Sequence, residues 1–154
     1  MAFISISIQT HLFSIAEEEA LLRAQQTDCG ALIAFQGMVR GNDHQKALSH
    51  LYLEHYPLVT EQEIQRIIQF ATERWPITAC RVIHRVGNLP VGEPVVLVIV
   101  MATHRKEAFK AAEYVMDFLK TEAPFWKKAC FVDGSEQWVA AKTSDAAAKA
   151  QWDE

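Results

Sequence analysis

Two lysines on either side of a proline are the residues of this chain best suited to chemistry. Lys120 and Lys127 lie seven positions apart in the segment Lys120-Thr-Glu-Ala-Pro-Phe-Trp-Lys127. A lysine ammonium can hold an anionic group in a dry site, and a lysine that loses its proton can act as a base. Like-charge repulsion from Lys127 would favour the neutral amine of Lys120. The alternative is that both are solvated side chains, with Lys120 complementing a helix dipole.

A second basic pair, His104 and Arg105, precedes the same segment by one helix length. A helix N-terminus attracts anions, so a basic pair there is placed against its local preference, although Glu107 in the first turn partly offsets the misfit. Guanidinium groups match phosphate oxygens, which also makes Arg40 a candidate ligand. These residues predict a site for a small phosphorylated molecule.

One helix, predicted over residues 105–120, joins the two basic clusters. Apolar residues recur in it at three- and four-residue spacing, which indicates a single buried face. Pro124 cannot continue a helix and disfavours helical geometry just before it, so the helix should end near Thr121 or Glu122. The residues of the predicted buried face are Phe109, Ala112, Met116 and Leu119.

The other elements follow from alternation, capping residues and turn residues. Capping boxes at Ser14 and Thr60 predict helices through about Gln25 and Trp75. Gly37 inside a strand indicates a bulge or a close backbone approach. Segments 41–46 and 87–93 are predicted as a polar loop, with His44 solvated, and a turn-rich connection. Strands are predicted within 4–8, 31–39, 51–56, 81–86, 95–101, 126–132 and 137–140.

This order of elements mixes hairpins with helices, which predicts an α+β fold with a mixed or antiparallel sheet. No linker or repeat divides the chain, so residues 1–154 are expected to form one domain. The tail over 144–154 is alanine-rich and helical by propensity. Whether it docks tightly is left open.

Composition excludes several classes of function. The chain has 154 residues, half of them hydrophobic, with a formal net charge of −4, which argues against a general nucleic-acid or membrane-surface binder. The longest apolar run, 94–102, is too short to span a bilayer, and no signal peptide is evident. We therefore expect a soluble, cytoplasmic protein.

The cysteines and histidines show no metal-binding or redox pattern. Three cysteines without a CxxC pair are typical of reduced thiols in a cytosolic protein. The histidines have no ligand spacing with acids or cysteines, so neither a metal nor a cofactor is expected. The cysteines are Cys29, Cys80 and Cys130.

Five motifs resemble the large, catalytic subunit of molybdopterin synthase. They occur in the family's order and cover most of the chain, and the last of them is the most specific. The motifs are Phe35-Gln-Gly-Met-Val-Arg40, Leu53-Glu-His-Tyr-Pro57, Ile83-His-Arg-Val-Gly87, Ala102-Thr-His-Arg105 and Met116-Asp-Phe-Leu-Lys-Thr-Glu-Ala-Pro-Phe-Trp-Lys-Lys128.

The resemblance implies an α/β-hammerhead fold and a sulfurtransferase of molybdenum cofactor biosynthesis. A homodimer would bind two small ubiquitin-like carrier subunits, giving a heterotetramer. The thiocarboxylated Gly-Gly tail of each carrier would supply sulfur to cyclic pyranopterin monophosphate, forming the dithiolene of molybdopterin.

The resemblance also implies the site residues, with Lys120 and Lys127 as the catalytic pair. Two positions depart from the family. Ala129 stands where the family commonly has Glu, and Met38 stands where a basic residue is frequent. A glutamate restored at 129 is expected to be tolerated, through a surface-type pair with a neighbouring lysine. The family's binding positions map onto Met38, Val39, Arg40, His104, Arg105, Lys120, Lys127, Lys128 and Ala129.

Two other functions compete with this enzyme. One is a non-catalytic module that docks a ubiquitin-like tail, and the other is a sensor of a phosphorylated ligand that uses only the His104–Arg105 end. Retention of both Lys120 and Lys127 favours the enzyme, because phosphate sensing leaves them unexplained. About 15 residues at ~1.5 Å rise separate the two clusters by roughly 22 Å. A site shared across a two-fold dimer would reunite them.

Overall fold

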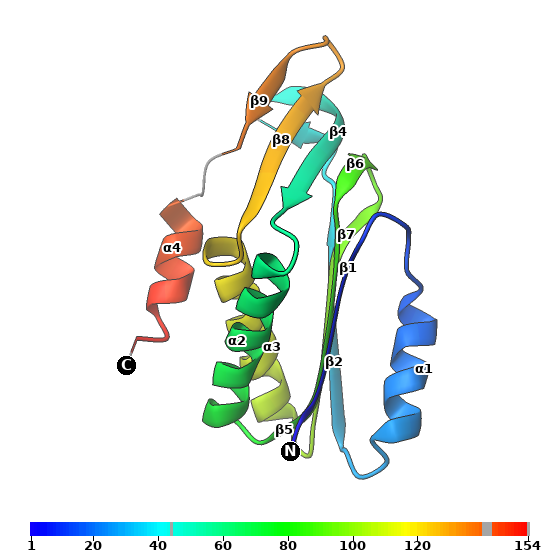
Figure 1. The fold of residues 1–154 in the computed structure, drawn as a ribbon, viewed down its shortest axis with the longest axis vertical. Coiled ribbons are helices and arrows are strands. Elements are labelled where there is room, and N and C mark those ends of the chain that lie inside the picture. The colour runs from blue at the N-terminus through cyan, green and yellow to red at the C-terminus, as the bar shows by residue number, and fades with distance from the viewer. Residues whose placement is uncertain (44, 140–142, 154) are drawn as a thin grey trace.

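The computed structural model describes residues 1–43, 45–139 and 143–153, which form an α+β fold built on two sheets (Figure 1). In the first sheet the strand order is β1-β5-β7-β2. β1 runs parallel to β5 and the other neighbours are antiparallel, which confirms the predicted mixed sheet. Its strands are β1 (Phe3–Gln9), β2 (Ala31–Met38), β5 (Ile77–Arg85) and β7 (Pro94–Ala102).

The second sheet stands beyond one end of the first, at the top of Figure 1. Its order is β3-β4-β8-β9, and β6 also pairs with β4. All of these pairings are antiparallel. The strands are β3 (Asn42–Asp43), β4 (Lys46–His55), β6 (Gly87–Pro90), β8 (Phe125–Phe131) and β9 (Glu136–Trp138).

Helices cover both faces of the first sheet (Figure 1). α1 (Ile15–Gln25) packs on one face through Leu22. α2 (Val59–Arg74) and α3 (Arg105–Thr121) enclose the main core against the other face. α4 (Thr143–Ala150) lies outside α3, and beyond it the half-buried Trp152 packs edge-on to Trp75 and Tyr114. The C-terminal segment is therefore held by aromatic contacts, a point on which the sequence was silent.

Two local predictions are confirmed at the N-terminal half. The Ser14 hydroxyl accepts the Glu17 N–H at 3.2 Å and starts α1. At Gly37 an added Cβ would lie 2.8 Å from the Val96 side chain, and the β2–β7 register shifts directly after it. Glycine is required there by the close approach of β7.

Three local predictions are wrong. Thr60 does not cap α2: the helix begins at Val59, with the Leu58 N–H bonded to the Glu61 carboxylate at 2.9 Å. The predicted loop 41–46 contains a hairpin between β3 and β4, and the predicted connection 87–93 contains β6. His44 lies outside the described residues.

The buried face of α3 also differs from the predicted one. Phe109 is 59% exposed and Met116 only half-buried. Small residues face the sheet instead, so α3 packs close to it. The buried residues of α3 are Ala108, Ala111, Ala112, Tyr114, Val115 and Leu119.

Candidate active site

Lys120 and Lys127 flank the corner between α3, which packs on the first sheet, and β8 of the second sheet. α3 ends at Thr121, Glu122 caps it, and β8 begins at Phe125. Both lysines are exposed. The helix end predicted from Pro124 is therefore confirmed, and the corner brings the two lysines to the same end of the molecule.

This corner is anchored to α2 by a buried hydroxyl. Thr60, which is fully buried, accepts the Tyr56 N–H at 2.9 Å and donates to the Pro124 carbonyl at 3.0 Å. Arg66 adds an ion pair to Glu122 at 2.9 Å. The segment that carries the lysines is thus positioned by α2.

The two faces of β8 separate Lys127 from Lys128, because side chains alternate across a strand. Lys127 lies opposite Leu53 and shares its face with Ala129, whereas Lys128 lies opposite Tyr52. Ala129 is fully buried and packs with Leu48 and Phe131. The expected surface-type pair for a glutamate at 129 is therefore wrong.

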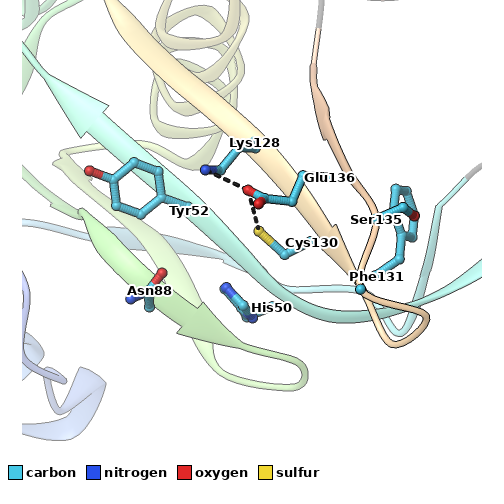
Figure 2. A pocket seen from close by; sticks show the side chains of 9 residues that line it. His50, Tyr52, Asn88, Lys128, Cys130, Phe131, Ser135 and Glu136 are labelled. Carbon is cyan, nitrogen blue, oxygen red and sulfur yellow. Dashed lines mark hydrogen bonds and ion pairs between the residues drawn. The ribbon is translucent and has the colours of Figure 1, made fainter.

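Lys128 lines a separate pocket on the other face (Figure 2). Its ammonium lies 2.6 Å from the Glu136 carboxylate and 5.2 Å from the Tyr52 ring centroid. The bond from Glu136 raises the pKa of Lys128. The pocket holds about 340 Å³, and His50, Asn88 and Cys130 also line it. The structure therefore does not bring Lys128 together with Lys127.

Residues 38–40 lie beside the face of β4 that carries Leu53, the register partner of Lys127. Val39 is buried, packs with Leu53 and Leu89, and has both backbone groups bonded, to Glu93 and Gly92. Its side chain is therefore turned into the core. Met38 and Arg40, on either side of it, are exposed. Arg40 is therefore an exposed residue next to one that is fixed in the core.

His104 and Arg105 lie at the opposite end of α3 from Lys120 (Figure 1). His104 is the N-cap residue, makes no side-chain capping bond, and is exposed, as is Arg105. Arg105 and Lys120 are 15 positions apart on α3 (120 − 105), which is about 22 Å at ~1.5 Å per residue. Within one chain the two basic clusters form no common site.

His84, which stacks on the first residue of β8, was not among the site residues predicted from the sequence. Its ring stacks on Phe125 with centroids 4.0 Å apart and planes 20° apart. Burial lowers the pKa of His84 to about 4, helped by the positive charges of Lys127 and His55 and opposed by the Arg85 carbonyl. The only sequence signal was one polar ring among apolar residues of a predicted strand.

Comparison with known proteins identifies the family of this chain. The MoaE protein family model matches residues 8–122. A molybdopterin synthase catalytic subunit from Mesorhizobium japonicum is 48% identical over 96% of this chain and 92% of its own length. That from Escherichia coli is 40% identical over 99% of this chain and 100% of its own. The chain belongs to the molybdopterin synthase catalytic subunit family. It is accordingly an enzyme subunit of molybdenum cofactor biosynthesis.

Solved structures of the family share the fold. The MoaE protein of Burkholderia ambifaria is 45% identical, with a TM-score of 0.83 over 99% of this chain and 98% of its own. The molybdopterin synthase of Staphylococcus aureus is 27% identical, with a TM-score of 0.78 over 87% of this chain and 96% of that one. The hammerhead-like fold implied by the motifs is confirmed.

Two of the three cysteines lie in environments that disfavour the thiolate. The three cysteines are free. Burial raises the pKa of Cys80 to about 12, and burial followed by Glu136 raises that of Cys130, which makes both poor nucleophiles at neutral pH. The described residues contain no cluster of three potential metal ligands, and no helix among them is long and apolar enough to cross a membrane.

Proposed function

We propose that this subunit transfers sulfur from the thiocarboxylated C-terminus of a small ubiquitin-like carrier to cyclic pyranopterin monophosphate, forming the dithiolene of molybdopterin. The observation that carries the proposal is the placement of Lys120 and Lys127 on an anchored corner, in a chain with catalytic-subunit relatives at 40–48% identity. Each thiocarboxylate holds one sulfur, so one dithiolene requires two carriers.

The two lysines have distinct proposed roles. The ammonium of Lys127, which lies opposite Leu53 on β4, holds the anionic carrier tail, because opposite charges attract strongly once the bound tail excludes water. Lys120, at the end of α3, moves protons on the pterin as sulfur replaces oxygen. Arg40, His104 and Arg105 bind the phosphate of the substrate. No metal or cofactor has a part in this scheme.

The distance along α3 supports a site shared by two subunits. Lys120 and Lys127 of one chain would act with His104 and Arg105 of the partner subunit, so that both basic clusters meet one substrate. The assembly would be a catalytic homodimer with one carrier per subunit. We also propose a cytoplasmic location, because the three cysteines are free thiols.

Product formation tests the activity. Purified protein is mixed with thiocarboxylated carrier and cyclic pyranopterin monophosphate, and dithiolene is measured, with Lys120→Ala as the matched inactive protein. A non-catalytic docking module would bind the carrier and form no product. Binding of carrier with no dithiolene from the unaltered protein would refute the proposed activity.

Mixing of inactive variants tests the shared site. Arg105→Ala and Lys120→Ala proteins are unfolded together and refolded. Half of the dimers are then mixed, and each mixed dimer has one intact site of two, so about one quarter of full activity should return. The control pair, Lys120→Ala with Lys127→Ala, places a lesion in every site and should restore nothing. No recovery in the first pair, with mixed dimers confirmed by mass, would refute sharing.

A further inference from the structure

His84 is a polar ring set into the apolar end of the main core. It is the next-to-last residue of β5, and its register neighbours are Ile8 on β1 and Val96 on β7. Both neighbours belong to the core packed against α2 and α3, as does Phe125, on which the His84 ring stacks. These contacts fix the orientation of the His84 ring.

The protonation of the ring follows from one hydrogen bond. Nδ1 of His84 lies 2.9 Å from the Arg85 carbonyl oxygen. A carbonyl only accepts, so Nδ1 carries the proton, and a neutral ring then presents Nε2 as an acceptor. Because burial, Lys127 and His55 hold the pKa of His84 at about 4, the ring is neutral at physiological pH.

The charged groups around the ring come from the second sheet. Phe125 and Lys127 are two positions apart on β8 and share one face, and His55 lies opposite Phe125 on β4. The positive charge of Lys127 lowers the pKa of His84. The register neighbours of His84 in the first sheet are apolar, and among the described residues Lys127 is the one permanent charge shown to lower its pKa.

We propose that His84 is a positioning residue for Lys127, offering a fixed, neutral acceptor nitrogen toward the ammonium of that lysine. A protonated ring would repel the same ammonium; burial keeps the ring neutral, and the Arg85 bond selects the tautomer in which Nε2 carries no proton. The catalytic consequence rests on the proposed function, in which Lys127 holds the carrier tail. A purely packing role would need the shape of the ring and not its acceptor.

Ring NMR tests the geometry without any activity assay. In protein labelled with ¹⁵N-histidine, the His84 ring should show a protonated Nδ1 and an unprotonated Nε2 at neutral pH. Lys127→Met should raise the pKa of His84, because a repelling charge is removed. Lys128→Met, the adjacent lysine on the other face of β8, should leave that pKa unchanged. A protonated Nε2, or equal titrations in both variants, would overturn the proposal.

Activity measurements then separate positioning from packing. His84→Gln places a carbonyl oxygen near the Nε2 position, whereas His84→Asn is too short to do so. Removal of the proposed acceptor for the Lys127 ammonium should slow sulfur transfer roughly tenfold to a hundredfold in His84→Asn, with partial rescue in His84→Gln. Equal rates in both variants and the unaltered protein would refute the inference while leaving the proposed function standing. An inactive unaltered protein would refute the proposed function, and the NMR result would still decide the geometry.

Discussion

Thr60→Val should loosen the corner that carries the two lysines. The Thr60 hydroxyl joins the Tyr56 N–H, 2.9 Å away, to the Pro124 carbonyl, 3.0 Å away, and its side chain is fully buried. Valine fills the same space but can neither accept nor donate. The substitution therefore removes the only hydrogen bonds by which this side chain ties α2 to the approach of β8.

The expected loss of stability follows from the groups left behind. A buried donor or acceptor that loses its partner costs about 1–3 kcal/mol. Tyr56 is exposed and its N–H can turn toward water, whereas Pro124 is half-buried. We therefore expect the free energy of unfolding to fall by about 1–3 kcal/mol, mainly through the Pro124 carbonyl. Sulfur transfer should fall as well, because the lysines lose their support.

Two matched threonine variants isolate the effect. Thr60→Ser keeps the hydroxyl and should lose only about 1 kcal/mol for the buried methyl group. Thr72, on the same helix, donates only to the Gln69 carbonyl within α2, so Thr72→Val should stay within about 0.5 kcal/mol of the unaltered protein. Urea denaturation gives all three values. If Thr60→Val is no less stable than Thr60→Ser, the hydroxyl does not anchor the corner.

Three further substitutions and one change of pH have defined outcomes. Lys120→Ala should abolish turnover while changing the free energy of unfolding by less than about 0.5 kcal/mol, and Lys120→Arg should also fail, because a guanidinium stays protonated; active Lys120→Arg would exclude proton transfer. Ala129→Glu should destabilise the fold by about 3 kcal/mol in a denaturation experiment, because it buries a carboxylate beside Leu48 and Phe131, and unchanged stability would contradict this packing. Acidification should also destabilise the protein through His84. Its pKa is about 4 in the folded chain against an ordinary 6.5, so between these values the unfolded state binds the extra proton and the free energy of unfolding falls by up to about 3 kcal/mol. Above pH 6.5 the contribution of His84 should be flat, and in His84→Phe this part of the pH dependence should be absent.

Local signals in the sequence were sufficient where one residue type decides the backbone. Pro124 ends α3 because proline cannot donate, Ser14 starts α1 because its hydroxyl accepts a free N–H, and Gly37 admits the close approach of β7. The placement of Lys120 beside the junction follows from the first of these. The separation of the two basic clusters follows from helix length alone.

Long-range contacts decided the features that the sequence did not predict. Thr60 has a capping residue's chemistry, but its hydroxyl serves Pro124, 64 residues away. β6 becomes a strand because β4 offers it an edge. Alternation alone puts Lys127 and Lys128 on opposite faces of β8, but which face each one takes depends on the pairing of β8 with β4, a contact between distant segments. His84 was missed because its role comes from Phe125, which reaches it only in the folded chain.

α3 acts as a fixed spacer between the two basic clusters. At one end the Thr60–Pro124 bond and the Arg66–Glu122 pair hold the corner beside Lys120. At the other end Gly30 lies so close to the Thr103 carbonyl that no Cβ fits, which packs the start of the helix against the β2 turn. Bending of a helix anchored at both ends cannot remove a separation of about 22 Å. If both clusters act on one substrate, a second chain must bring them together, and for this reason the mixing experiment is decisive.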